Sequence, residues 1–215
     1  MKFSSPLTSF YWNTENPNLI GCSSIDTTCT LWDIEKQAIS TQIIAHDKEV
    51  FDISFSKYQN QFATASADAS IRTFDTRNLD QSTILFESMD KTPFLRVAWN
   101  KENEYILATI LMEKKEVLIL DIRLPMTPFI TLCGHSDSVN SIAWAPKSPF
   151  HICTVGDDTK AYIWDLEVEN SKSQEPLEPI LTYSAEAEIR NLLWPHPHID
   201  WVAITFQNTL QLLKV

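Results

Sequence analysis

An internal repeat runs through this chain and limits its fold more than any other feature of the sequence. Large aromatic residues that end a Ser-, Ile- or Val-rich run recur at intervals of 43, 44, 45 and 50 residues, at Trp12, Phe55, Trp99, Trp144 and Trp194. Self-similarity at a fixed period is the signature of repeat architectures, in which one unit cannot bury its hydrophobic face alone and stacks on its neighbours. We therefore expect a series of similar units rather than one irregular core.

A second marker follows the same period. An Asp preceded by a bulky residue comes 20 to 22 residues after each of the first four aromatic residues, at Trp32-Asp33, Phe74-Asp75, Leu120-Asp121 and Trp164-Asp165. These Asp residues are themselves 42, 46 and 44 residues apart. Two markers that recur with nearly the same period through four units indicate a true repeat.

Each unit is expected to consist of short β-strands. Helical periodicity is nearly absent, and short runs rich in Val, Ile, Thr and aromatic residues alternate with polar turns. The period matches the roughly 40–45 residues of a WD repeat, which forms one four-stranded blade of a β-propeller. The sequence therefore predicts an all-β, WD40-type β-propeller in a single domain, residues 1–215. Its five predicted blade units cover approximately residues 8–45, 50–87, 94–133, 138–183 and 188–215.

The fifth unit is shorter than the others. It ends at residues 210–215, where its third strand should finish, and no sequence follows for an outer strand. WD-repeat propellers usually have seven blades, and an open arc exposes two blade faces and a sheet edge. We expect the chain to be part of a seven-bladed parent. A ring of five blades is the alternative, because propellers are known with roughly four to eight.

The fourth unit matches the WD repeat in its polar residues as well. In WD-repeat proteins a His, a Ser or Thr, a turn Asp and the Trp form a buried, hydrogen-bonded tetrad. By this resemblance the four places are filled by His135, Thr154, Asp158 and Trp164. Such a network satisfies buried polar groups and holds a tight turn against the neighbouring strands. We therefore interpret these residues as structural, although a His beside an Asp and a Thr also resembles a catalytic group.

Other units carry the tetrad in part. The second unit has His46, Thr64 and Asp68, with a Phe in the place of the Trp. The first unit offers Asp26 with Trp32 but has no preceding His in the chain. The third unit has a Lys where the Asp would fall, and we expect no tetrad there.

Several stretches resemble one particular family of WD-repeat proteins. The most specific are Ser-Ser-Ile-Asp-Thr-Thr-Cys-Thr at residues 23–30 and Ala-His-Asp-Lys-Glu-Val at residues 45–50, supported by residues 6–13, 120–125 and 142–154. Together they are similar to the plant TRANSPARENT TESTA GLABRA proteins and their animal relatives, the cullin-ligase-associated WD-repeat adaptors. The resemblance covers nearly the whole chain and corresponds to the C-terminal two thirds of the family, with its N-terminal third absent.

This resemblance implies a function. Members of the family are scaffolds without chemistry of their own; they join helix-loop-helix and MYB transcription factors in plants and hold dual-specificity, tyrosine-regulated kinases in animals. They also associate with cullin-type ubiquitin ligases through the propeller adaptor of the ligase. We therefore expect a non-enzymatic scaffold for regulatory protein complexes, and the alternative is a substrate receptor of a cullin-type ligase. A propeller enzyme is a more distant alternative, because the repeat leaves no polar cluster unexplained near the central channel.

Ligase association in WD-repeat proteins is linked to a Trp-Asp-x-Arg motif, and the chain has two approximations that lack the Trp. They supply the candidate partner-binding residues Asp75, Arg77, Asp121 and Arg123. An Arg just past the third strand lies near a blade rim, where its planar guanidinium suits contact with a partner carboxylate or carbonyl. The alternative is that each Arg pairs with the Asp two positions before it and serves only its own blade.

Charge and composition narrow the possible partners. The net charge of −11, from 17 basic and 28 acidic residues, disfavours direct binding of nucleic acid. The best apolar run, residues 106–112, is too short to cross a membrane, and the N-terminus lacks the apolar core of a signal peptide. We expect proteins as partners, no membrane association, and a cytoplasmic or nuclear location.

The remaining candidate sites have simple structural interpretations. The four cysteines, Cys22, Cys29, Cys133 and Cys153, form no Cys-x-x-Cys pair, so we expect small buried thiols in a reducing compartment. The sequence His196-Pro197-His198 is expected to be a polar turn rather than a metal site, and residues 167–188 a solvated loop. No metal ion and no other cofactor is expected.

Overall fold

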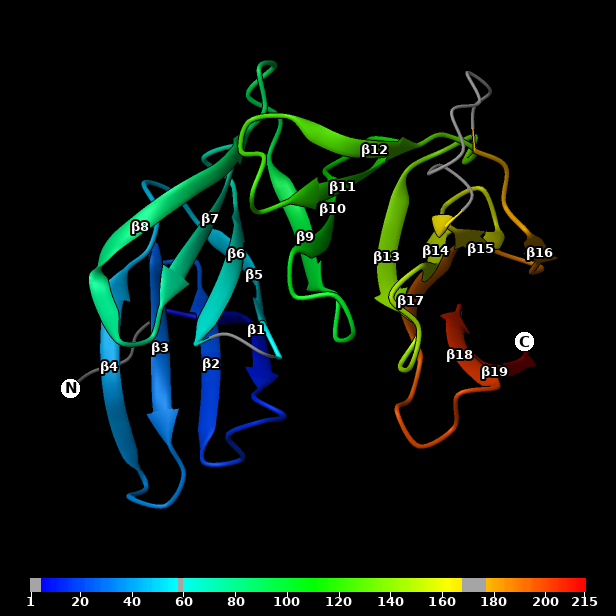
Figure 1. Cartoon of the computed structure of the whole chain (residues 1–215). Coiled ribbons are helices and arrows are strands. Elements are labelled where there is room, and N and C mark those ends of the chain that lie inside the picture. The colour runs from blue at the N-terminus through cyan, green and yellow to red at the C-terminus, as the bar shows by residue number, and fades with distance from the viewer. Residues whose placement is uncertain (1–4, 58–59, 168–176) are drawn as a thin grey trace.

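Five antiparallel sheets make up the structure, a computed structural model that describes residues 5–57, 60–167 and 177–215. Four sheets have four strands and the last has three, and in each of them strands that follow one another in sequence are neighbours (Figure 1). No α-helix occurs among these residues, and they contain no helix long and apolar enough to cross a membrane. The predicted all-β fold of blade-like units is therefore confirmed.

The sheets are called the first to the fifth blade, in chain order. The first blade consists of β1 (Leu7–Trp12), β2 (Leu19–Ser24), β3 (Thr28–Asp33) and β4 (Ala38–Ile44). The second consists of β5 (Val50–Phe55), β6 (Gln61–Ser66), β7 (Ser70–Asp75) and β8 (Asn78–Glu87). The third consists of β9 (Phe94–Trp99), β10 (Ile106–Leu111), β11 (Val117–Asp121) and β12 (Pro128–Leu132).

The last two blades complete the chain. The fourth consists of β13 (Val139–Trp144), β14 (His151–Gly156), β15 (Lys160–Asp165) and β16 (Leu181–Ser184). The fifth consists of β17 (Ile189–Leu193), β18 (Trp201–Phe206) and β19 (Thr209–Lys214).

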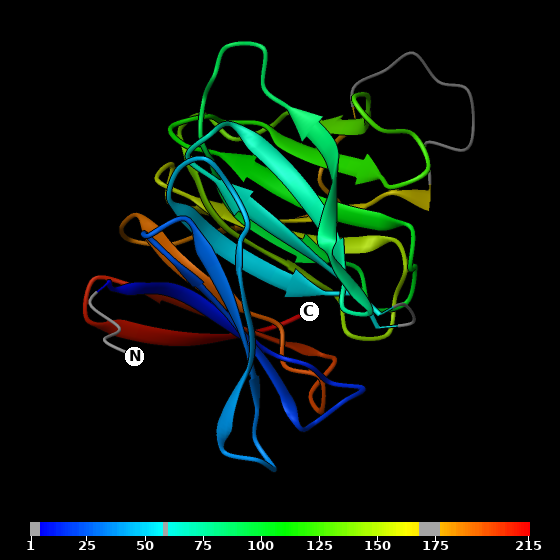
Figure 2. The same cartoon turned by 90° about the vertical axis from the view of Figure 1, so that its left-hand side faces the viewer.

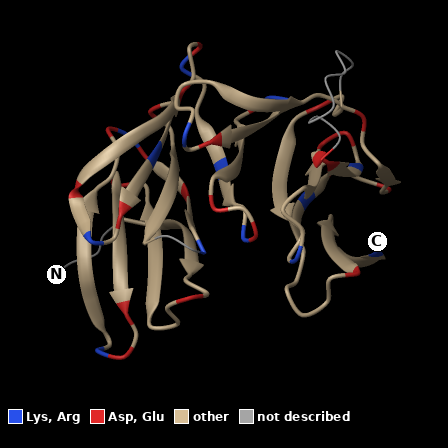
Figure 3. Ribbon diagram, in the orientation of Figure 1, with Lys and Arg blue, Asp and Glu red and all other residues tan. Residues whose placement is uncertain are grey.

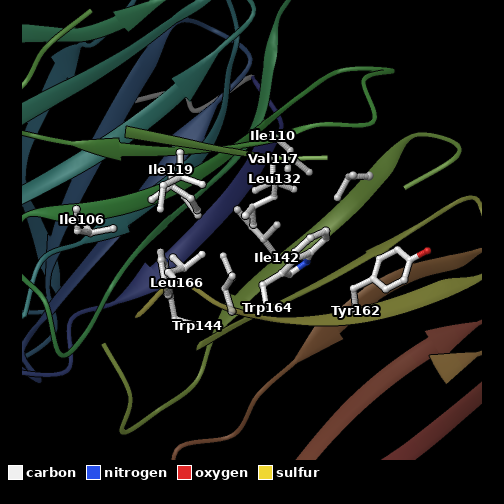
Figure 4. Close-up of a cluster of buried hydrophobic side chains, with 14 residues drawn as sticks. Ile106, Ile110, Val117, Ile119, Leu132, Ile142, Trp144, Tyr162, Trp164 and Leu166 are labelled. Carbon is white, nitrogen blue, oxygen red and sulfur yellow. The ribbon is translucent and has the colours of Figure 1, made fainter. Parts of the chain in front are cut away.

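The hydrophobic core lies between the blades rather than within them. Each of four clusters joins one face of a blade to the opposite face of the next blade. Figure 4 shows the contact between the third and fourth blades, where Ile110, Val117 and Leu132 lie near Trp164 and Leu166 lies near Trp144. A twisted sheet can bury both of its faces in this way only when it has a neighbour on each side.

Polar side chains tie the inner strands together. The carboxylate of Asp52 on β5 accepts a hydrogen bond from Val97 N on β9 at 3.0 Å, and Ser54 Oγ accepts one from Trp99 N at 3.0 Å. Asn140 on β13 donates to the carbonyl oxygen of Ile189 on β17 at 2.9 Å. These bonds fix neighbouring first strands side by side, so that the blades radiate from them.

The five blades form an open arc. Figure 1 shows the first and fifth blades at its two ends, and no strand of the first blade pairs with a strand of the fifth. Figure 2 views the arc from the side of the first blade and shows the twisted sheets stacked beside one another. The two outermost faces of the arc therefore lack the neighbour that every internal face has.

Candidate functional site

The fourth blade brings the four predicted tetrad residues together. His135 lies in the loop before β13, Thr154 on β14, Asp158 in the β14–β15 turn and Trp164 on β15. The imidazole Nε2 lies 2.7 Å from Thr154 Oγ1, and Nδ1 lies 2.9 Å from Asp158 Oδ2. The indole of Trp164 donates to Thr154 Oγ1 at 2.9 Å. The side chains of all four residues are buried, so no substrate reaches them.

The protonation state of this tetrad follows from its burial. Burial lowers the pKa of His135, and this effect outweighs the hydrogen bond and charge of Asp158, which raise it. A neutral imidazole then donates from Nδ1 to Asp158 and accepts at Nε2 the proton of the Thr154 hydroxyl. Asp158 also accepts the backbone N–H groups of Ser136 and Lys160, which pins the β14–β15 turn.

The second blade builds a related network with two additional members. His46 Nε2 lies 2.7 Å from Thr64 Oγ1, and His46 Nδ1 lies 2.9 Å from Asp68 Oδ2. Ser70 donates to Asp68 at 2.6 Å, and Arg72 Nη2 donates to it at 3.3 Å. Burial raises the pKa of Asp68 while hydrogen bonds from His46 and Ser70 lower it, and the net shift is downward.

Ser70 and Arg72 were not among the predicted residues. Asp68, Ser70 and Arg72 are each two residues apart in the sequence. In an extended strand this spacing places all three side chains on the same side, and it could have predicted that Ser70 and Arg72 join the network. Arg72 also donates to the backbone oxygen of Ala45 and to the carboxylate of Asp47, at 3.2 and 2.9 Å. It therefore joins the buried network to the surface.

The first blade separates its two predicted tetrad residues. Asp26 accepts hydrogen bonds from the backbone N–H and the hydroxyl of Thr28, at 3.2 and 2.6 Å, and so shapes the β2–β3 turn. Trp32 instead has Cys22 as a partner, and Cys22 occupies the register position that Thr154 has in the fourth blade. Burial raises the pKa of this thiol more than the hydrogen bond from Trp32 lowers it.

Two Asp-x-Arg corners occupy the ends of β7 and β11. Asp75 Oδ1 accepts hydrogen bonds from Arg77 N and Nε, each at 2.9 Å, and Oδ2 accepts one from Nη2 at 2.5 Å. Asp121 binds Arg123 through the same atoms at the same distances. The hydrogen bonds from Arg77 lower the pKa of Asp75 to about 2. Each Arg is therefore paired with its own Asp, as the alternative interpretation predicts.

The pairing also presents both guanidinium groups to solvent. The side chains of Arg77 and Arg123 are 71% and 60% exposed, and Arg123 lies over the ring of Tyr105, 4.3 Å from its centroid. Among the described residues, Nη1 of neither Arg makes a hydrogen bond. The corresponding position, two residues after the Asp, carries Glu35 in the first blade and Glu167 in the fourth, and Lys36, one position further on, pairs with Asp33. Of these four described corners, those of the second and third blades have an Arg at this position.

A partly buried lysine, Lys101, lies beside the inner strands. Burial lowers the pKa of Lys101 to about 7. Its Nζ donates to the backbone oxygen of Phe55 and lies 4.6 Å from the centroid of the Tyr11 ring. The ammonium group therefore links a third-blade loop to the first two blades. No sequence pattern predicts this role of Lys101.

Two further predictions can be compared with the structure. His196-Pro197-His198 lies in the exposed connection between β17 and β18, and no group of three or more potential metal ligands is found among the residues that the structure describes. Cys22, Cys29 and Cys153 are buried, whereas Cys133 is exposed. The prediction of a buried thiol is therefore wrong for Cys133, because it follows the outer strand β12, which has no further strand beside it. The predicted solvated loop over residues 167–188 is wrong for Leu181–Ser184, which form β16 because they pair with β15, and residues 168–176 lie outside the described residues.

The sequence of the chain matches a known protein family and known proteins. The model of the family "WD domain, G-beta repeat" matches residues 37–75 and 126–165, the segments that contain the two His–Asp networks. The chain is 51% identical over 215 residues to the "DDB1- and CUL4-associated factor 7 homolog" of Dictyostelium discoideum, and the match covers 100% of this chain and 65% of that protein. An uncharacterized WD repeat-containing protein of Schizosaccharomyces pombe is 34% identical, with 98% of this chain and 61% of that protein covered. The chain thus spans less than two thirds of the length of both relatives.

Proposed function

The chain belongs to the WD-repeat proteins, and we propose that it works as a non-enzymatic scaffold that assembles regulatory protein complexes. The observation that carries this proposal is the pair of exposed, oriented guanidinium groups at the ends of β7 and β11. An Arg that is already held by a carboxylate loses little conformational freedom when its remaining N–H groups bind a partner. Arg77 and Arg123 therefore have the properties of a preorganised contact for protein oxygen atoms.

The buried networks argue against catalysis. The His–Asp–Thr sets of the second and fourth blades have the composition of catalytic groups, but their polar atoms are hydrogen-bonded to one another beneath the surface. A general base must reach the proton that it removes, either directly or through one water molecule. These residues are better explained as supports for the β6–β7 and β14–β15 turns.

The partner that the two Arg corners favour is the adaptor of a cullin-type ligase. The name of the Dictyostelium relative describes it as associated with DDB1 and CUL4. Arg77 and Arg123 occupy equivalent corners of neighbouring blades, so one partner surface can contact both. A role as the ligase's substrate receptor is the second candidate function, and it requires the same contact.

The proposal covers other partners as well. The resemblance to the plant and animal adaptors favours transcription factors and dual-specificity kinases, in the cytoplasm or the nucleus. Acidic and basic residues are interspersed along the loops and strand ends, without a continuous basic run (Figure 3). This distribution, together with the net charge of −11, favours protein partners over nucleic acid.

Affinity purification from native cells, followed by quantitative mass spectrometry, tests the scaffold role and the ligase contact together. The double substitution Arg77→Ala and Arg123→Ala should reduce recovery of the ligase adaptor by about tenfold or more, because it removes two charged contacts. Transcription factors or kinases should remain bound. Lys36→Ala removes an exposed cation that pairs with Asp33 at the end of β3, so it is the control for loss of positive charge. It should change neither the recovery of the ligase adaptor nor that of the other partners.

Two outcomes would overturn parts of the proposal. Unchanged adaptor recovery with the double variant would exclude the Arg corners as the ligase contact. Recovery of no regulatory protein with the wild-type chain would exclude the scaffold role itself.

A further inference from the structure

The sequence contains four Ser or Thr residues that a Pro follows directly, and the structure presents one of them differently from the rest. Protein kinases of the proline-directed class transfer phosphate to a Ser or Thr in this context. Thr127 is exposed, whereas Ser5, Thr92 and Ser148 are partly buried. Accessibility therefore distinguishes Thr127 from the other three candidate acceptors.

The hydroxyl of Thr127 is also free of internal bonds. Within the described part of the chain, Thr127 Oγ1 makes no hydrogen bond. By contrast, Ser148 Oγ lies 2.7 Å from His151 Nδ1 and accepts the backbone N–H of Phe150 at 3.2 Å. A phosphate on Ser148 would disrupt this local network, whereas a phosphate on Thr127 would replace only contacts with water.

The chain around Thr127 is accessible over the length that a kinase binds. It connects β11 to β12, and residues 123–127 and Phe129 are all exposed. A backbone hydrogen bond from Met126 N to the oxygen of Leu85, at 2.7 Å, ties it to the second blade, and Phe129 is skipped in the pairing of β12 with β11. The following proline favours the extended backbone at Thr127 in which kinases bind their substrates. Few bonds therefore have to open for this segment to enter an active site.

Arg123 lies four residues before Thr127 in the same loop. Four residues span at most about 14 Å when fully extended, and a turn closed by Leu124 N and the oxygen of Asp121, at 3.0 Å, shortens this loop. Nε and Nη2 of Arg123 donate to Asp121, while Nη1 has no hydrogen bond to any described residue. An Arg donor is therefore available close to Thr127, and Arg binds phosphate through short, charge-assisted hydrogen bonds.

We propose that Thr127 is the phosphoryl acceptor of a proline-directed protein kinase and that the resulting phosphate binds Arg123. In this step Thr127 Oγ1 forms a bond to the γ-phosphorus of ATP, the bond from that phosphorus to the β,γ-bridging oxygen breaks, and ADP leaves with the electron pair. The hydroxyl proton passes to the catalytic base of the kinase. The product carries nearly two negative charges, and residues 122–128 contain no other acidic group that would repel it.

A phosphate bound to Arg123 competes with any partner that uses this guanidinium. This consequence rests on the proposed role of Arg123 in binding the ligase adaptor. Arg77 has no such neighbour, because β8 begins directly after it and the hydroxyl of Thr76 already donates to the oxygen of Asn60 at 3.2 Å. Phosphorylation should therefore weaken the third-blade corner and leave the second-blade corner unchanged.

Phosphorylation of the purified chain tests the acceptor. The chain would be incubated with ATP and either a mitogen-activated or a cyclin-dependent kinase, and phosphate at each site would be followed by quantitative peptide mass spectrometry. Thr127 should be modified at least about tenfold faster than Ser148, because Ser148 must first open its local structure. Thr127→Ala should remove this fast phase, and Thr92→Ala, at a partly buried Thr-Pro pair, is the matched control that should keep it. Absence of phosphate from Thr127 with both kinases, or equal rates at all four pairs, would overturn the proposal.

A titration followed by ³¹P NMR tests the contact with Arg123. The second pKa of a phosphothreonine is ordinarily about 6. In the phosphorylated chain this pKa should be lower by about 0.5 or more, because a nearby guanidinium favours the dianion. Arg123→Ala should restore the ordinary value, whereas Arg77→Ala should not. A phosphate pKa that is the same in the wild type and in Arg123→Ala would exclude the contact.

Binding of purified DDB1 separates this inference from the proposed function. The phosphorylated chain should bind DDB1 about fivefold more weakly than the unmodified chain, and Arg123→Ala should abolish the difference. If DDB1 binds neither form, the proposed ligase contact is wrong, while the mass spectrometry and the ³¹P titration still decide whether Thr127 is the acceptor and Arg123 its partner. Equal affinity of DDB1 for the two forms would exclude the competition for Arg123.

Discussion

The hydroxyl of Thr154 has two simultaneous tasks in the fourth blade. It accepts the indole N–H of Trp164 and gives its own proton to His135, whose other nitrogen is bound to Asp158. Because these side chains are buried, any one of them that loses its partner becomes an unsatisfied polar group in a low-dielectric surrounding. At the scale of single residues, the tetrad therefore acts as one cooperative unit.

Replacing Thr154 by Val tests this cooperation while keeping the shape of the side chain. We expect the free energy of unfolding to fall by about 3 kcal/mol, because both His135 and Trp164 lose a buried partner. Urea unfolding measures the change. Thr109→Val is the matched control: Thr109 has the same register position in the third blade, but its hydroxyl only donates to the Arg96 carbonyl, and the expected loss is about 1 kcal/mol. Equal losses would contradict the account.

The two histidines also make stability depend on pH. Burial lowers the pKa of His46 and His135 from the ordinary value of 6.5. Protonation below pH 6.5 then favours the unfolded state, so their contribution is complete above 6.5 and is lost as the pH falls through the folded-state values. We expect the free energy of unfolding to decrease between pH 7 and pH 5.

The variant His46→Gln/His135→Gln provides the comparison for this pH effect. It should be less stable at pH 7 but should have a flatter dependence between pH 7 and pH 5 than the wild type. Guanidinium unfolding at several pH values measures both slopes. Parallel slopes would show that the histidines do not cause the decrease.

At the scale of elements, three tight turns contain a residue other than glycine in the left-handed backbone conformation. The residue after the turn Asp has a positive φ in three hairpins: 74° at Thr27, 68° at Ala69 and 65° at Thr159. None of these residues is a glycine, so the left-handed conformation is unfavourable and needs support from outside. The preceding Asp supplies it, since Asp26, Asp68 and Asp158 each accept the N–H two residues later.

Comparing two of these turns separates the turn from the tetrad. Asp26→Ala removes only local turn contacts and should cost about 1 kcal/mol. Asp158→Ala also releases His135 and the N–H of Ser136, and should cost about 3 kcal/mol. Chemical unfolding of both variants provides the test. A loss for Asp26→Ala as large as that for Asp158→Ala would contradict a separate stabilising role for the tetrad.

The repeat predicts these elements because a fixed period places equivalent residues at equivalent points of each hairpin. It predicts strands, turns and the His–Asp–Thr sets of the second and fourth blades for that reason. It does not predict the participation of Arg72, which depends on the reach of a long side chain to Ala45 and Asp47. The partner of Trp32 was also missed, because a thiol at Cys22 replaces the expected hydroxyl.

At the scale of the whole molecule, stability depends on which blade faces are covered. The inter-blade clusters bury both faces of the second, third and fourth blades, but only one face of the first and of the fifth. Residues at one register position therefore contribute very differently along the arc. The sequence predicts repeated blades, whereas the faces that stay exposed could be identified only from the strand register.

Two substitutions at one register position test this view. Ile119→Ala in the third blade creates a cavity against the fourth blade and should cost about 3 kcal/mol. Leu212→Ala in the fifth blade removes an exposed side chain and should change stability by about 0.5 kcal/mol or less. Urea unfolding at low protein concentration compares them. A large loss for Leu212→Ala would show that the side chain of Leu212 is covered in the isolated chain.

The central proposal is that this WD-repeat arc is a scaffold and that Arg77 and Arg123 bind the adaptor of a cullin-type ligase. Equilibrium binding of purified DDB1 to the purified chain tests it most directly. The account predicts that Arg77→Ala/Arg123→Ala raises the dissociation constant by about 30-fold or more, equivalent to about 2 kcal/mol, while Lys36→Ala changes it by less than about twofold. A dissociation constant that is the same for the wild type and the double Arg variant would contradict it.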